Sequence, residues 1–135
     1  MVASDLYGFH EADPAAVRLQ LEQLFRTPME PRESSYVSNG EYYALTLPDE
    51  TSLSLRTNYD EQEKEWAEPD FQAFPILLYV EAKDKGDVLR DKLTSVIGGI
   101  RFLQREVCTP DCRFLRIRRE ADKDVVVFEK DLPRR

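Results

Sequence analysis

The run of apolar residues from Ile76 to Val80 is the feature that most constrains the fold of this chain. It is the only stretch of five consecutive large apolar residues in the sequence. A strand with one solvent-facing side alternates apolar and polar residues, whereas an uninterrupted run is typical of a strand covered on both faces. Pro75 suits the first position of such a strand, where a missing N–H costs little. We therefore predict an interior strand with a helix packed on one side.

Length and composition indicate a single globular domain spanning residues 1–135. With 135 residues, 41% of them hydrophobic and 33% charged, the chain is long enough to bury a core. The net charge of −7 disfavours nucleic acid as a partner and allows a protein partner with a basic surface. The first five residues lack the pattern of a signal peptide, and no segment approaches the roughly 18 apolar residues that span a bilayer. We expect a cytoplasmic protein with no membrane partner.

The clearest local signal is the start of a helix at Asp13 and Pro14, after a short candidate strand at residues 6–9. Asp is a favoured N-cap, and Pro suits the first helical position. Apolar residues then recur at helical spacing and form one stripe, which predicts a helix that ends before Pro28. The residues of this stripe are Val17, Leu21, Leu24 and Phe25.

The segment from Ser35 to Leu45 is predicted to be a β-hairpin. Asn39-Gly40 is the preferred pair for a two-residue type I′ turn, because both positions need positive φ. This register places Val37 opposite Tyr42 and Tyr36 opposite Tyr43. The side chains of residues 43, 45 and 47 share a face, a turn follows at residues 48–51, and residues 53 and 55 alternate with polar residues. Three antiparallel strands are thus expected between about residues 34 and 57.

A second helix is expected to begin near Asp84, with apolar residues at helical spacing. Its end is left open, because Gly98-Gly99 either stops it or lets it continue to about Glu106. Two further strands, at residues 115–117 and 125–127, are joined by a charged turn. The predicted fold class is α+β, a mostly antiparallel sheet with two helices packed on it, in the order β-α-β-β-β-α-β-β. The predicted helical core residues are Val17, Leu21, Leu24, Phe25, Leu89, Leu93 and Val96. Ile97 and Ile100 continue the helical spacing of the second helix.

The sequence shows no motif for catalysis, a metal or a cofactor, and we predict none of the three. Cys108 and Cys112 are the only cysteines, and neither a third cysteine nor a nearby histidine completes a zinc site. We interpret them as thiols in a turn, with a reversible disulfide as the alternative. The sole histidine, His10, would have to serve as any catalytic base, and no G-x-S-x-G sequence is present. Gly98-Gly99 lacks the context of a phosphate loop, whereas paired carboxylates remain open.

Residues 60–70, which we call the acidic segment, are the strongest candidate for a binding site. They contain six acidic residues, one lysine and the only tryptophan of the chain. Aromatic residues flanked by acids serve as interface anchors, with the charges steering a basic partner. Two other interpretations remain, a solvated loop and a tryptophan folded back over the end of the sheet. The candidate binding residues are Asp60, Glu61, Glu63, Glu65, Trp66, Glu68 and Asp70.

Two resemblances to known families add expectations. Up to Ala82, the element order resembles the βαβββ module of the glyoxalase and extradiol-dioxygenase superfamily. That resemblance implies metal ligands, usually His and Glu, from paired modules. The chain offers only His10, beside Glu11, and no second module is evident.

The chain contains the short pieces Leu6-Tyr7-Gly8-Phe9, Ser34-Ser35-Tyr36, Gly40-Glu41-Tyr42-Tyr43 and Glu68-Pro69-Asp70-Phe71. Together these pieces resemble small cytoplasmic bacterial immunity proteins that act against secreted toxins. This second resemblance implies a non-catalytic acidic domain that masks a basic toxin surface. The alternative function is a small-molecule-binding protein or enzyme that uses the cavity of a curved sheet.

Overall fold

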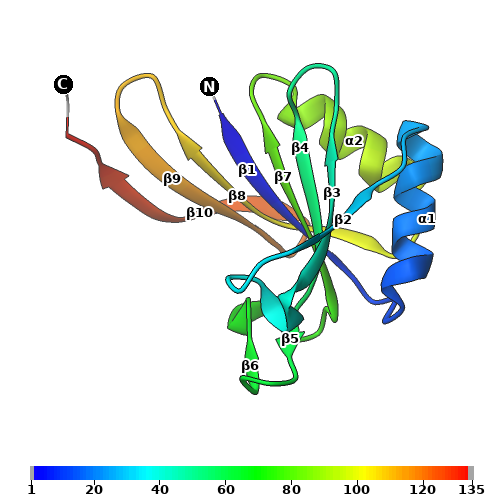
Figure 1. Cartoon of the computed structure of the whole chain (residues 1–135). Helices are drawn as coiled ribbons and strands as arrows, with labels where there is room; N and C mark the ends of the chain where they lie inside the picture. The colour runs from blue at the N-terminus through cyan, green and yellow to red at the C-terminus, as the bar shows by residue number, and fades with distance from the viewer. Residues whose placement is uncertain (1, 134–135) are drawn as a thin grey trace.

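Eight antiparallel strands form one twisted sheet, and two helices cover part of one of its faces (Figure 1). The computed structural model of the protein describes residues 2–133. The strands lie in the order β10-β9-β8-β1-β7-β4-β3-β2, and a separate small hairpin is formed by β5 and β6. The α+β class is therefore as predicted. The elements are β1 (Ala3–Phe9), α1 (Pro14–Phe25), β2 (Glu30–Glu33), β3 (Glu41–Thr46), β4 (Ser52–Thr57), β5 (Tyr59–Asp60), β6 (Glu65–Trp66), β7 (Ile76–Ala82), α2 (Gly86–Val96), β8 (Ile100–Cys108), β9 (Arg113–Glu120) and β10 (Lys123–Asp131), with single 3-10 turns at Ser38–Gly40 and Pro69–Phe71.

The predicted interior strand is confirmed as β7, which lies between β1 and β4. Leu78 is opposite Tyr7 of β1 and Leu55 of β4. Both Leu77 and Leu78 are fully buried although they point to opposite faces of the sheet. This double coverage is why the sequence of β7 does not alternate. The predicted element order is four strands short: it omits one of the four strands expected between residues 34 and 80, the acidic segment contributes two short strands, and β8 was not predicted.

Helix α1 begins as the sequence predicts. The Asp13 carboxylate accepts a hydrogen bond from the N–H of Ala15 (3.0 Å), and Pro14 occupies the first turn. Val17 and Leu21 are buried, whereas residues 24 and 25 pack against the core from its margin. The helix ends where Arg26 adopts a left-handed conformation (φ 54°).

Helix α2 is shorter than the longer of the two predictions, which continued it to about Glu106. It begins at Gly86 with Lys85 at the N-cap position, and it ends at Val96, just before the two glycines. Gly99 has a φ of +80°, a conformation that glycine adopts readily, and it turns the chain into β8. The continuation to Glu106 is therefore wrong. The core assignment of Val96 is also wrong, because that side chain is 61% exposed in the last turn, whereas Ile97 beyond the helix is buried.

The predicted hairpin around Asn39-Gly40 is wrong in its first strand. The partner of β3 is β2, with Pro31 opposite Tyr43 and Arg32 opposite Tyr42. Residues 34–40 form a loop that ends in a 3-10 turn. The expected cross-strand pairs of Tyr36 and Val37 therefore do not form; Tyr36 is 97% exposed and Val37 is buried elsewhere.

The side chain of Asn39 explains this difference. Asn39 and Gly40 do have positive φ (61° and 72°), as the sequence indicated. However, the Asn39 amide donates to Thr57 Oγ1 (2.7 Å) and to the carbonyl of Tyr59 (2.8 Å), and its oxygen accepts from the N–H of Glu61 (2.9 Å). These bonds hold the turn against the acidic segment, so it cannot be the free tip of a hairpin.

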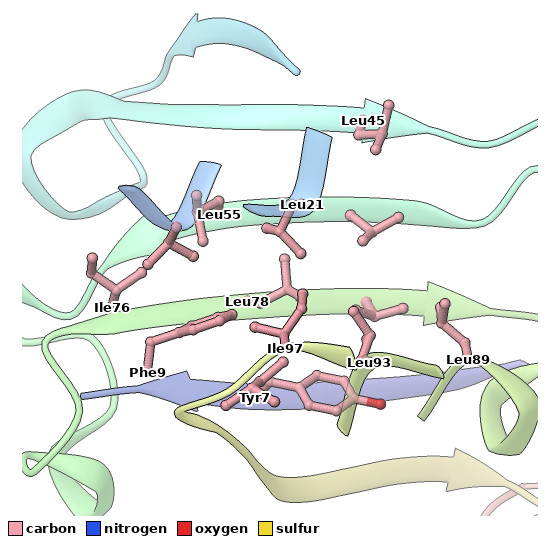
Figure 2. Close-up of a cluster of buried hydrophobic side chains, with 14 of the residues drawn as sticks. Tyr7, Phe9, Leu21, Leu45, Leu55, Ile76, Leu78, Leu89, Leu93 and Ile97 are labelled. Atoms are coloured by element: carbon pink, nitrogen blue, oxygen red, sulfur yellow. The ribbon is translucent and has the colours of Figure 1, made fainter. Parts of the chain in front are cut away.

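The main core lies between the helices and one face of the sheet. Figure 2 shows side chains from β1, β4 and β7 meeting those of α1 and α2 in one continuous layer. A smaller cluster on the opposite face consists of Leu6, Leu77 and Leu103, with Phe71, Phe74 and Tyr79 packed against it. No described helix is both long and apolar enough to cross a membrane. The residues of the main cluster include Tyr7, Phe9, Leu53, Leu55, Ile76, Leu78, Val80, Ile100 and Phe102.

Candidate functional site

The acidic segment folds as a small hairpin at one end of the sheet (Figure 1). Tyr59 pairs with Trp66, and Asp60 pairs with Glu65. Lys64 closes the turn, with its N–H donating to the carbonyl of Asp60 (2.8 Å) and a φ of 54°. The single 3-10 turn at Pro69–Phe71 then leads the chain back to β7. The segment is thus a structured element rather than an open loop.

Asn58, which precedes the acidic segment, hydrogen-bonds to residues at the end of the segment and just after it. Its side chain is fully buried, and its amide nitrogen donates to the carbonyls of Phe71 and Phe74 (both 3.0 Å). Its amide oxygen accepts from the N–H of Glu68 (2.9 Å), and its backbone bonds with Ala67 and Pro75 (2.7 and 2.9 Å). Sequence reasoning missed this residue, since a lone asparagine before a strand has no distinguishing pattern.

The carboxylate of Asp60 organises the hairpin from within. It accepts backbone N–H bonds from Gln62 and Glu63 (both 2.9 Å) and from Asn39 (3.0 Å). These donors stabilise the charged form, and they lower the pKa of Asp60 below its usual range. Asp60 therefore joins the hairpin to the loop at residues 34–40.

Glu68 and Asp70 are also engaged within the molecule. The hydroxyl of Tyr79 donates to Glu68 (3.0 Å), and burial together with this carboxylate raises the pKa of Tyr79 well above its usual value. Arg118 of β9 forms an ion pair with Asp70 (2.9 Å) and lies over the ring of Phe71. Both acids therefore tie the segment to the sheet.

The remaining three acids, Glu61, Glu63 and Glu65, differ from the others. We call them the hairpin carboxylates. All three are exposed, and within residues 2–133 no cation forms an ion pair with any of them. The structure thus separates the seven candidate residues into three free carboxylates, three acids with partners and one aromatic ring.

A polar groove of about 580 Å³ lies between the hairpin and the loop at residues 34–40. Trp66 lines it, half-buried, with its ring edge-on to Tyr59 at 4.9 Å between centroids. Tyr36 and Tyr79 contribute two further aromatic rings, and Glu63 and Glu65 contribute carboxylates. Sequence reasoning missed Tyr36 as a groove residue, because it was assigned to a strand that does not form.

Arg56 also lines this groove, and its guanidinium contacts two neighbouring aromatic rings. Its guanidinium lies over Tyr79 (4.8 Å to the centroid) and Tyr42 (5.4 Å), and it donates to Ser54 Oγ (2.8 Å). Contacts of a guanidinium with aromatic faces fix it in place. Acidic groups outnumber this single cation among the lining residues.

A second groove, of about 650 Å³, lies beside the start of α1. It is lined by the rings of Tyr42 and Tyr43 and by Pro14 and Pro31. Its volume falls within the roughly 300 to 1,000 Å³ of small-molecule sites. This groove is a candidate location for the alternative function, a small-molecule binder or enzyme.

The residues considered for metal or thiol chemistry lie apart from both grooves. His10 is exposed in the turn after β1 and stacks on Phe74 (4.6 Å between centroids). Cys108 and Cys112 flank the turn between β8 and β9, and both are free thiols. Over the described part of the chain, no group of three or more His, Cys, Asp or Glu residues is arranged to hold a metal ion. In comparisons with known proteins, no family model matches the chain and no curated protein matches it significantly.

Proposed function

We propose that this protein is a non-catalytic binding module for a protein with a basic surface, of the kind expected for an immunity protein that masks a toxin. The observation that carries this proposal is the set of three hairpin carboxylates, which are free, exposed and held on an anchored hairpin beside the polar groove that Trp66 lines. Free carboxylates on a fixed element attract a cationic surface without first breaking internal ion pairs.

The distribution of charge along the chain supports the same partner class. Residues 1–99 contain 19 of the 26 acidic residues but only nine of the 19 basic residues. The part of the molecule that carries the acidic segment is therefore strongly negative. Such a field raises the association rate with a positive partner, and salt weakens it.

The aromatic residues have a different role from the acids in this proposal. Exposed ion pairs are each worth about 0 to 1 kcal/mol, so the acids act mainly on the association rate. Trp66 and Tyr36 offer large rings at the groove, and tryptophan and tyrosine dominate the affinity of many interfaces. Affinity and association rate should therefore respond to different substitutions.

Affinity capture from the native host with three forms of the protein tests the proposal. The first is the wild type, and the second carries Glu61→Gln, Glu63→Gln and Glu65→Gln. The third is a charge-matched control that neutralises three exposed acids elsewhere, which form no ion pair among residues 2–133, by Asp91→Asn, Glu120→Gln and Asp122→Asn. A partner recovered by the wild type and the control, but depleted with the hairpin variant, supports the proposal.

Kinetic measurements with the captured partner then separate the two roles. The hairpin variant should slow association and flatten its salt dependence, whereas Trp66→Ala should speed dissociation and leave the protein folded. If the hairpin variant binds like the charge-matched control, and Trp66→Ala unfolds the protein, the acidic segment is structural and the proposal fails.

The groove beside α1 keeps the alternative function testable. Its two tyrosine rings and its volume are suited to a small organic ligand. Tyr43→Ala would remove one of these rings, and a metabolite that co-purifies with the wild type but not with this variant would favour the small-molecule function.

A further inference from the structure

The edge strand β10 exposes a row of apolar side chains between two lysines. It forms one end of the eight-stranded sheet, away from α1, and α2 reaches it through the ion pair of Arg90 with Asp124 (2.9 Å) (Figure 1). Val125, Val126, Val127 and Phe128 are consecutive and 37–50% exposed. An edge strand presents unpaired backbone N–H and C=O groups, and proteins usually protect such an edge or use it for strand pairing.

The register with β9 shows which side chains share a face of this edge. Val125 is opposite Arg118, Phe128 is opposite Arg116, and Lys130 is opposite Phe114. Since alternate residues of β9 point to one face, these β10 residues lie on that same face, together with Lys123 at the start of the strand. Along this face β10 reads as a cation, two large apolar residues and a second cation.

The acidic side chains of β10 are paired with arginines, and in this respect its two lysines differ from them. Asp124 pairs with Arg90 (2.9 Å) and Arg119 (3.1 Å), while Glu129 and Asp131 both pair with Arg113 (2.6 and 3.7 Å). By contrast, neither Lys123 nor Lys130 has an ion-pair partner within the described residues. The free charge at this edge is therefore positive, at both ends of an apolar row.

We propose that β10 accepts an extended segment of another polypeptide as a ninth, antiparallel strand. The segment would have an apolar centre and an acidic side chain at each end. The bulge at Val127 sets the spacing of these acids, because the pairing moves from Val126 with Ile117 to Phe128 with Arg116. With one residue taken up by the bulge, Lys123 and Lys130 are six ladder positions apart, so the two acids must be six residues apart. This inference is independent of the proposed function of the acidic segment.

A second copy of this chain fits the edge less well than a different polypeptide does. Every carboxylate of β10 already has an arginine partner in its own chain. Pairing two β10 strands would therefore bring no free acid to either lysine. A segment with uncommitted carboxylates supplies what the edge lacks, which is charge complementarity to Lys123 and Lys130.

The test uses a capped heptapeptide of sequence Glu-Thr-Val-Thr-Ile-Thr-Glu, added to the isotope-labelled full-length protein and followed by NMR. Its first residue would face Lys130, and its last would face Lys123. A second peptide carries lysine in place of both glutamates, and a protein variant carries Lys123→Glu and Lys130→Glu. Both substituted side chains are exposed, so the variant should give the spectrum of a folded protein.

We expect the acidic peptide to shift and protect amides of β10 in the wild type. The charge-reversed variant should bind this peptide about tenfold more weakly, since two favourable surface pairs become repulsive, and it should prefer the lysine peptide. Three results would overturn the proposal: both peptides bind equally well, binding occurs elsewhere or not at all up to millimolar concentration, or sedimentation shows a dimer whose β10 amides are protected without peptide.

Discussion

Replacing Asn58 by alanine tests whether one buried side chain holds the candidate site in place. The substitution removes three hydrogen bonds, two donated to the carbonyls of Phe71 and Phe74 (both 3.0 Å) and one accepted from the N–H of Glu68 (2.9 Å). Each such bond contributes about 0.5 to 1.5 kcal/mol net. We therefore expect the free energy of unfolding to fall by about 3 kcal/mol, within roughly 1.5 to 4.5 kcal/mol.

Urea denaturation and native-state hydrogen exchange measure this effect together. Denaturation gives the loss of stability. The amides of Glu68 and Ala67 should lose protection, because Glu68 donates to the Asn58 side chain and Ala67 donates to the backbone carbonyl that this side chain holds in place. Gln62→Ala, an exposed substitution in the same segment, is the control and should change stability by less than about 0.5 kcal/mol. If Asn58→Ala is as mild as this control, and both amides stay protected, the anchoring role assigned to Asn58 is refuted.

Three further predictions follow from burial and charge. Leu78→Ala should lower the free energy of unfolding by about 2 to 5 kcal/mol in urea denaturation, because Leu78 is fully buried, while Val88→Ala on the exposed face of α2 serves as a mild control. The pKa of Asp60 is lower in the folded state, so the ionised carboxylate stabilises the fold above the unfolded pKa of about 3.9, and this stabilisation is lost as the pH falls through the folded pKa. An NMR titration should show the hairpin loosening over that pH range, and Asp60→Asn should remove this pH dependence. Gly8→Ala should destabilise by about 1 to 3 kcal/mol, since a Cβ would lie 2.5 Å from an aromatic ring atom, whereas Gly98→Ala meets nothing within 4 Å and should be tolerated in the same assay.

The parts of the fold that the sequence predicted well are those set by short-range signals. The apolar run of β7 encodes its coverage on both faces, and Asp13 with Pro14 encodes the start of α1. The final two strands were also predicted, since their apolar residues are bounded by a charged turn. In each case the residues that decide the local structure are neighbours in the chain.

Strand β8 was missed because its pattern depends on a distant partner. A bulge disturbs its alternation, as the pairing with β1 moves from Leu6 with Gln104 to Tyr7 with Phe102. Arg105 points to the helix-covered face, where its guanidinium forms bonds of 2.7 and 2.9 Å with the buried carboxylate of Asp5. An arginine at such a position looks like a helix-surface residue until its partner, 100 residues away, is known.

The composition of the acidic segment pointed to its location but not to the roles of its members. Asp60 is committed to Asn39, Glu68 to Tyr79 and Asp70 to Arg118. These partners come from three other parts of the chain, so no local pattern distinguishes the three engaged acids from the three free ones. Only the tertiary structure reduces the candidate site to the hairpin carboxylates and the groove.

The links between the two walls of the groove have a consequence for binding. The loop that carries Tyr36 and the hairpin that carries Trp66 are joined by the side chains of Asn39 and Asp60, which bond across the two segments at 2.8 to 3.0 Å. Ordering a loop on binding costs free energy, and walls fixed beforehand avoid part of that cost. A partner that contacts both rings therefore meets a prearranged surface. Removing the Asn39 side chain should accordingly weaken such a contact even though Asn39 does not line that groove.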